Sequence, residues 1–228
     1  MKKLLIATKN PAKFNDIKSA LNDLHLEFIN LNDIGIKENV SETGKTFEEN
    51  AKKKALFYAK KSGLLTLADD GGIEIDALNG DPGVKTRRWI DGKQSSDEQL
   101  IKYTIIRMKR YKDRSAQLRA VLCLATPKGK TYQVEGKIKG VIAQKPYKSF
   151  KQGFPFDALL YFPDKRKYYY QLKYEEKNPI NHRSIALQKI KPILKTITSK
   201  EPIRFASLAK RVTLEVADLP VEASAQAG

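Results

Sequence analysis

Apolar and polar residues recur with two different periods along the first third of the chain, and these periods predict alternating strands and helices. The runs at 3–8 and 26–31 are short and apolar, as buried strands are. Between them, Phe14, Ile17 and Leu21 follow a proline at helical spacing, which predicts a helix with that proline in its first turn. The chain is therefore expected to begin as strand, helix, strand.

A second helix is expected to begin after Thr46, because Glu49 follows three residues later in the pattern of a capping box. Gly63 is expected to end this helix. Its apolar stripe consists of Phe47, Ala51, Ala55 and Tyr58. The apolar run at 64–68 then predicts a strand that ends at two aspartates, and the alternating residues at 73–78 predict another strand.

Strands cluster in the later part of the chain. Ser95 or Ser96 is expected to cap a third helix, and two long strands are predicted around 117–126 and 131–143. A further strand is predicted at 156–162. A last helix carries an apolar face formed by Ala186, Ile190, Ile193 and Ile197. Alternating elements followed by clustered strands predict a mixed α/β fold.

The composition favours one large domain with a short extension. The chain has 228 residues, of which 41% are hydrophobic, and this is enough for a sizeable core. Beyond Val212 lysine and arginine are absent, although the body of the chain is rich in both. We therefore expect a folded domain over residues 1–200 and a partly disordered C-terminal extension over 201–228.

The chain carries no recognisable secretion signal and no apolar run of the roughly 18 residues needed to span a bilayer. Its single cysteine, Cys123, lies in an apolar run and is interpreted as a core residue without a disulfide partner. These features predict a cytoplasmic protein that has no membrane partner.

The net charge of +17 is the strongest compositional signal. A basic protein attracts polyanions such as nucleic acids, membrane surfaces or phosphorylated small molecules. The lysines are spread along the whole chain, however, and this spread also fits solvated helix faces in a lysine-rich protein. Charge alone leaves both interpretations open.

The segment ATKNPAK places Thr8, Asn10 and Lys13 around the start of the first predicted helix. Backbone N–H groups at a helix N-terminus, a hydroxyl and an ammonium together suit a phosphate group. A capped helix with a solvated lysine is the alternative interpretation.

The segment LADDGG sets Asp69 beside Asp70, so a positive group must compensate them or one carboxyl must hold a proton. Together with Glu42, which lies in the loop before the second helix, they form an oxygen-ligand set of the kind that binds Mg²⁺. Gly71 and Gly72 would let a ligand or another backbone come close. A tight turn capped by an aspartate is the alternative.

A third group of candidates lies late in the chain. Asp157 stands among aromatic residues in FPFD, and His182 and Arg183 precede the last predicted helix. Aromatic faces can stack on a nucleobase, and planar carboxyl and guanidinium groups can read its polar edge. Alternatively, the phenylalanines belong to the core and the His-Arg pair faces solvent.

Taken together, these segments resemble the inosine and xanthosine triphosphate pyrophosphatases, also called the HAM1-like family, over roughly residues 3 to 197. The six matching motifs, in the family's order, are ATKNPAK, SETGKTFEENAKKKA, LADDGGIEIDALNGDPGV, EGKIKGVI, GFPFD and EKNPINHRSIA. The resemblance implies an elongated mixed β-sheet with flanking helices that form two lobes around a central cleft. It also implies a homodimer and Mg²⁺-dependent hydrolysis of ITP, dITP and XTP to the monophosphate and pyrophosphate.

The resemblance assigns the phosphate and metal contacts to particular residues. Glu42 and Asp70 would hold the metal, Asp70 would be the general base that activates water, and Asp69 would support it. Lys177 would contact the phosphates. The other triphosphate contacts would come from the first motif: Thr8, Lys9, Asn10, Pro11, Ala12 and Lys13.

The base contacts follow in the same way. His182 and Arg183 would read the 6-oxo edge of the base. A base with the wrong edge would leave these buried polar groups unpaired, so the site would discriminate against it. Gly71 would lie beside the ligand. The purine would be held by Phe154, Pro155, Phe156 and Asp157.

Three positions depart from the family pattern. Gly71 stands where the family usually has serine or threonine, so a hydroxyl contact to the ligand is missing. Pro155 replaces a glycine and lacks an N–H group. Asn181 replaces a serine and can still cap a helix. These departures make a shifted base specificity one alternative. A basic nucleic-acid-binding protein with weak catalysis is the other, and KRKYYYQLKY is its best support.

Overall fold

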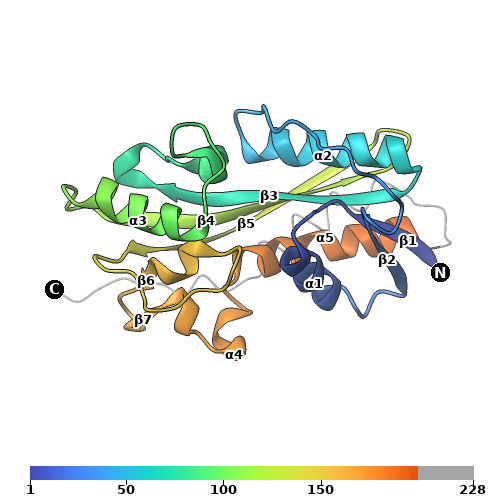
Figure 1. Ribbon diagram of the computed structural model, residues 1–228. Helices are drawn as coiled ribbons and strands as arrows, with labels where there is room; N and C mark the ends of the chain where they lie inside the picture. The colour runs from blue at the N-terminus through green and yellow to red at the C-terminus, as the bar shows by residue number, and fades with distance from the viewer. Residues whose placement is uncertain (200–228) are drawn as a thin grey trace.

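The computed structural model describes residues 1–199 and contains a long, seven-stranded mixed sheet (Figure 1). The strand order is β2-β1-β3-β4-β5-β6-β7, in which β2, β1 and β3 are parallel and each later pair is antiparallel. The strands are β1 (Lys2–Ile6), β2 (Leu26–Asn30), β3 (Leu65–Ile75), β4 (Ser115–Ala125), β5 (Thr131–Ile142), β6 (Leu160–Phe162) and β7 (Lys167–Tyr168).

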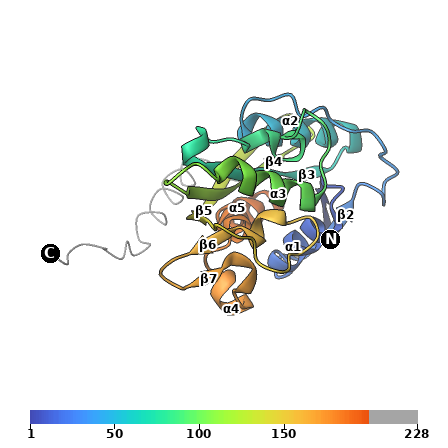
Figure 2. The same ribbon diagram turned by 60° about the vertical axis from the view of Figure 1, so that its left-hand side comes forward.

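Helices cover both faces of this sheet, with α2 (Phe47–Ser62) on one face and α1 (Pro11–Ala20) and α5 (His182–Thr198) on the other (Figures 1 and 2). The remaining helices are α3 (Asp97–Met108), the short α4 (Tyr174–Lys177) and four 3₁₀ segments at Asp76–Leu78, Gly83–Arg88, Pro155–Ala158 and Tyr169–Gln171. The predicted mixed α/β sheet with flanking helices and two lobes is confirmed. No helix within residues 1–199 has the length and apolar character needed to cross a membrane.

The helix boundaries follow the capping residues in the sequence. The Thr46 hydroxyl accepts a hydrogen bond from the N–H of Glu49, and Gly63 ends α2 at a φ of 69°, as predicted. The Glu49 carboxylate accepts the N–H of Lys45 rather than that of Thr46, so the expected capping box is incomplete. Ser96, and not Ser95, caps α3.

The prediction that a strand ends at the two aspartates is wrong. Asp69 and Asp70 lie in the middle of β3, which runs without interruption through both glycines and pairs throughout with the equally long β4. A Cβ atom on Gly71 would collide with the carbonyl oxygen of Arg119 in β4, so glycine permits close pairing here. The tight-turn interpretation of LADDGG is therefore excluded.

Two other strand predictions were too long. The strand expected at 73–78 ends at Ile75 and continues as a 3₁₀ turn. Of the strand expected at 156–162, only Leu160–Phe162 is extended, because the segment begins as a 3₁₀ helix whose first residue, Pro155, has a fixed φ and no N–H group. The predicted C-terminal extension, 201–228, lies outside the described residues.

The short strand β1 leaves a gap beside its longer neighbour β3. β1 pairs with β3 only at Leu65, Thr66 and Leu67, and the last contact on this side is the hydrogen bond from the Ala7 N–H to the Leu67 carbonyl, at 2.8 Å. Beyond Leu67, β3 keeps β4 as its neighbour, and within residues 1–199 no strand pairs with its other side before the bridge between Glu74 and Pro82. This gap in the sheet is where Asp69 and Asp70 lie.

Candidate active site

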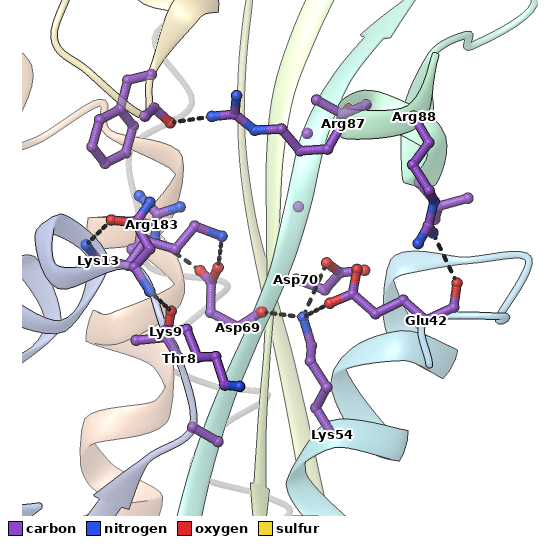
Figure 3. A pocket seen from close by; sticks show the side chains of 18 of the residues that line it. Thr8, Lys9, Lys13, Glu42, Lys54, Asp69, Asp70, Arg87, Arg88 and Arg183 are labelled. Atoms are coloured by element: carbon purple, nitrogen blue, oxygen red, sulfur yellow. Dashed lines mark hydrogen bonds and ion pairs between the residues drawn. The ribbon is translucent and has the colours of Figure 1, made fainter. Parts of the chain in front are cut away.

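A cavity of about 440 Å³ opens at this gap between the two lobes (Figure 3). Most of the residues predicted from the sequence meet in its wall: Thr8, Lys9, Asn10, Lys13, Glu42, Asp69, Asp70, Gly71, Phe154, Pro155, Phe156, Asp157, His182 and Arg183. Pro11 and Ala12, the first two residues of α1, are not part of the wall. Lys177 lines a neighbouring cavity instead.

The turn at the start of α1 is organised by Asn10. Its side-chain oxygen accepts the N–H groups of Ala12, at 2.9 Å, and Lys13, at 3.3 Å, so the predicted cap is present. The Thr8 hydroxyl accepts the N–H of Asn10 at 3.1 Å, and the Lys9 ammonium donates to the carbonyl of Lys37. These bonds hold the side chains of the turn at the cavity wall, while the N-terminal N–H groups of α1 are already occupied.

Asp69 is buried, and two cations pair with its carboxylate. Its carboxylate accepts a hydrogen bond from the Arg183 Nε at 2.8 Å and forms an ion pair with Lys13, and its side chain is 0% exposed. Burial opposes the charge of Asp69, but Arg183 and Lys13 together hold its pKa well below its usual range. The Asp69 carboxylate is therefore ionised, and each of its oxygens has a cationic partner.

Asp70 has a different environment, since it shares one lysine with Glu42. The Lys54 ammonium lies 2.7 Å from Glu42 Oε1, 3.2 Å from Asp70 Oδ1 and 2.8 Å from the carbonyl of Asp69. Asp70 Oδ2 is buried and has no hydrogen-bond partner within residues 1–199. Burial raises the pKa of Asp70, and Lys54 only partly opposes the increase.

The two aspartates differ because side chains alternate along a strand. Asp69 points to the face covered by α1 and α5, and Asp70 points to the face covered by α2 (Figure 3). The expectation that positive groups compensate the pair is confirmed, and separate cations do so on the two faces. The charges repel less than adjacency in sequence suggests.

Lys54 was missed among the sequence candidates, although a signal was present. It follows Ala51 by three residues and precedes Tyr58 by four, so it lies on the buried stripe of α2 rather than on the solvated face. A lysine on such a stripe requires anionic partners, and here these are Asp70 and the partly exposed Glu42.

Two arginines near the mouth of the cavity were also missed. Arg87 forms an ion pair with Asp97 and donates to the carbonyl of Gly153 at 3.1 Å, while Asp97 accepts the Gly153 N–H at 2.6 Å. Arg88 donates to the carbonyl of Glu42 at 3.1 Å. The first arrangement fixes the loop that precedes Phe154, and the second fixes the loop that carries Glu42.

The donor set around Asp70 fits a divalent cation. Carboxylate oxygens of Glu42 and Asp70 lie close enough together to share the Lys54 ammonium, and Asp70 Oδ2 lacks a partner within residues 1–199. Within the same range, no group of three or more histidine, cysteine or acidic residues is arranged to hold a metal by itself. Two carboxylates suit Mg²⁺, which keeps several waters and takes its other ligands from phosphate.

The late candidates lie between this cavity and a second one of about 590 Å³. Phe154, Asp157, His182 and Arg183 line both, and in the second cavity the Lys177 ammonium lies 2.7 Å from the Asp157 carboxylate. Burial raises the pKa of Asp157, and Lys177 opposes this. Because these four side chains line both cavities, a ligand bound in either cavity can contact them.

His182 and Arg183 are buried, with 7% and 6% exposure, so the solvent-facing alternative is wrong. Burial, and then the neighbouring Arg183, lower the pKa of His182 well below its usual value. The imidazole is therefore neutral at pH 7 and can present one donor and one acceptor to a ligand. Asn181 caps α5 through the N–H groups of Arg183 and Ser184, as expected.

Comparison with known proteins adds an independent observation. The model of the Ham1 family matches residues 4–193. A dITP/XTP pyrophosphatase of Clostridium perfringens is 38% identical over 205 residues, which cover 86% of this chain and 99% of the relative. A dITP/XTP pyrophosphatase of Bacillus subtilis is 38% identical over 196 residues, which cover 85% and 98%.

Solved structures agree with the sequence comparison. The Ham1 protein of Staphylococcus aureus superimposes with a TM-score of 0.75 at 34% identity and covers 85% of this chain and 98% of its own. A HAM1 protein from Coxiella burnetii gives a TM-score of 0.78 at 33% identity and covers 86% and 99%. Since the family model spans almost the whole described fold, and relatives align over nearly their full length, the chain belongs to the Ham1 family.

Proposed function

We propose that this protein is a nucleoside triphosphate pyrophosphatase that hydrolyses non-canonical purine nucleotides, namely ITP, dITP and XTP, to the monophosphate and pyrophosphate. The observation that carries the proposal is the combination of groups that line one cavity. The cations Lys13 and Lys54 and the carboxylate of Asp70 line the same cavity as the aromatic ring of Phe154 and the polar side chains of Asp157 and His182.

Mg²⁺ is proposed as the cofactor, with Glu42 and Asp70 as its protein ligands. The unpartnered Asp70 Oδ2 and the hard oxygen donors support this assignment. When bound, the ion would neutralise phosphate charge and lower the pKa of the attacking water.

Asp70 is proposed as the general base. Its raised pKa keeps the carboxylate basic enough to accept a proton from water as the oxygen attacks phosphorus. The bond between the α and β phosphates breaks, and the displaced oxygen leaves as part of pyrophosphate. Lys13 and Lys54 offset the developing charge, and Asp69 holds Lys13 and Arg183 in place for this task.

The base is proposed to contact the wall that the two cavities share. Phe154 offers an aromatic face, and Asp157, Arg183 and neutral His182 offer polar edges. A buried site with fixed donors and acceptors discriminates strongly, because an unsuitable base leaves them unpaired. Lys177, which the family resemblance places on the phosphates, is paired with Asp157 in this arrangement and lies closer to the base end.

A shifted base specificity is the second candidate. Gly71 cannot supply a hydroxyl, and Pro155 cannot donate an N–H. The substrate range is therefore part of the experiment, which should include pyrimidine nucleotides. A homodimer and a cytoplasmic location are also proposed from the family resemblance, and light scattering of the purified protein would test the first of these.

The test is pyrophosphate release from ITP, XTP, dITP, ATP, GTP and dUTP with Mg²⁺, for wild type, Asp70→Asn and the exposed control Asp164→Asn. We expect ITP, dITP and XTP to be preferred over ATP, GTP and dUTP, Asp70→Asn to lose activity and Asp164→Asn to retain it. Wild-type inactivity on every nucleotide would contradict the proposal. Salt-sensitive RNA or DNA binding without hydrolysis would favour the nucleic-acid-binding alternative suggested by the charge of +17.

A further inference from the structure

Tyr169 carries a buried hydroxyl for which neither the fold nor the proposed reaction accounts. It belongs to the tyrosine run of KRKYYYQLKY, and its side chain is 1% exposed. Its hydroxyl has no hydrogen-bond partner within residues 1–199. Buried polar groups in native proteins are nearly always paired, so such a hydroxyl requires an explanation.

The surroundings of Tyr169 are those of a ligand site. Its side chain lines the second cavity beside Asp157, Lys177 and His182. The Lys177 ammonium lies 4.1 Å from the centre of the tyrosine ring, and the centre of the His182 ring lies 6.4 Å away. His182 Nδ1 is also buried without a partner within residues 1–199. One cavity wall therefore holds two unpaired polar atoms.

Packing alone does not require the hydroxyl. The ring of Tyr169 packs edge-on against Phe162, with 6.0 Å between ring centres, and phenylalanine would preserve this contact. An unpaired buried hydroxyl lowers stability relative to phenylalanine. A buried hydroxyl that costs stability, on a side chain that lines a cavity, is expected to gain its partner from a ligand.

The hydroxyl has a suitable protonation state. Burial raises the pKa of Tyr169, and the nearby Asp157 raises it further. The group therefore stays protonated and can donate a hydrogen bond throughout the neutral pH range. With Lys177 and Arg183 it supplies donors on a wall that also holds the Asp157 carboxylate, and a donor hydroxyl suits an oxo group rather than an exocyclic amine.

We propose that Tyr169 is a specificity-determining residue whose hydroxyl donates a hydrogen bond to an oxo group of the purine base. The inference rests on the proposed function. The Lys177 ammonium covers the ring in this structure, so the hydroxyl reaches the base after Lys177 has turned toward the ligand. Tyr169 would thus favour inosine and xanthosine nucleotides over adenosine nucleotides.

The test compares Tyr169→Phe with Tyr170→Phe, a matched control in which the neighbouring tyrosine is 37% exposed. We expect Tyr169→Phe to raise KM for ITP and XTP about tenfold with kcat within about twofold, because one hydrogen bond to the base is lost. Its KM for ATP should not change, so its selectivity falls. Its Tm should equal or exceed that of wild type, which separates the effect from misfolding.

Equilibrium binding of inosine monophosphate, measured without metal, provides a readout that does not depend on turnover. We expect about tenfold weaker binding by Tyr169→Phe and wild-type binding by Tyr170→Phe. Unchanged KM and binding in Tyr169→Phe, or equal losses for ITP and ATP, would overturn the inference. If wild type binds the monophosphate but hydrolyses no nucleotide, the proposed function fails, and the binding comparison alone decides the role of Tyr169.

Discussion

The two faces of β3 hold adjacent aspartates in opposite electrostatic states. On the face covered by α1 and α5, Asp69 has one cation for each of its carboxylate oxygens. On the face covered by α2, Asp70 and Glu42 share the single ammonium of Lys54, and Asp70 Oδ2 lacks a partner within residues 1–199. One face is electrostatically complete, and the other has an excess of negative charge.

Asp69 and Asp70 are neighbours in the sequence, but their different surroundings suit them to different roles. A fully paired, fully buried carboxylate holds the cations around it, and removing it leaves those charges uncompensated. A carboxylate with a raised pKa and a free oxygen can bind a cation or accept a proton. We therefore expect the Asp69 carboxylate to contribute mainly to stability and the Asp70 carboxylate mainly to the proposed chemistry.

The largest expected effect is on the Asp70 face. Asp70→Asn should lower kcat for ITP or XTP by about 10³-fold or more, because the proposed general base and one proposed metal ligand are lost together. Its free energy of unfolding should stay within about 1 kcal/mol of wild type, because the ionised form of this buried carboxyl is itself unfavourable. Pyrophosphate release and urea unfolding measure the two quantities. Equal losses of activity and stability would remove the proposed distinction.

Asp69→Asn should produce the converse result. The buried Arg183 and the partly buried Lys13 would lose their anion, so the free energy of unfolding should fall by about 3–5 kcal/mol. Asp164→Asn, at an exposed position, serves as the control. Urea unfolding at pH 7 checks the effect, and an unfolding midpoint close to that of wild type would contradict it.

Removing Lys54 should sharpen the contrast by increasing the negative charge on the Asp70 face. In EDTA, Lys54→Met should lose about 1–3 kcal/mol of stability, because Glu42 and Asp70 then repel each other without an ammonium. Mg²⁺ should raise Tm more in this variant than in wild type, since the ion replaces the missing positive charge. Thermal unfolding with and without Mg²⁺ measures this. Lys52→Met, at an exposed position on the same helix, should show no such gain.

The smallest effect concerns pH on the Asp69 face. The folded-state pKa of His182 lies below its ordinary value of 6.5, so the unfolded chain takes up this proton first and the stability from neutral His182 is lost as pH falls below about 6.5. Between pH 7 and pH 5 this contribution should be about 1–2 kcal/mol. His182→Gln should flatten the loss of stability by that amount, and His25→Gln, at the other, exposed histidine, should not. Identical pH profiles for wild type and His182→Gln would refute the assignment.

Local signals were sufficient for much of the fold and for the location of the site. Thr46, Gly63 and Asn181 act where the sequence places them, because caps depend on neighbouring backbone groups. The continuity of β3 could not be predicted in this way, since its partner β4 begins about 50 residues later and only pairing makes LADDGG a strand interior. The separate environments of Asp69 and Asp70 follow from that continuity.

Lys54 and Arg87 were missed because their roles depend on where their side chains point in the folded protein. Lys54 belongs to a run of three lysines, and only the register of α2 on the sheet distinguishes it from its exposed neighbours. Arg87 likewise gains its importance from Gly153, which lies far away in the sequence. Such contacts depend on tertiary packing, so they cannot be predicted from composition alone.

The short β1 has a consequence for self-association. Where β1 stops, the edge of β3 between Leu67 and Glu74 has no strand beside it within residues 1–199, and such edges are templates on which another chain can add a strand. Here the Lys54 ammonium occupies the carbonyl of Asp69 on that edge, and charged side chains line the approach. The groups proposed for catalysis thus also protect the protein from edge-to-edge aggregation, so variants that make the cleft apolar should lose solubility as well as activity.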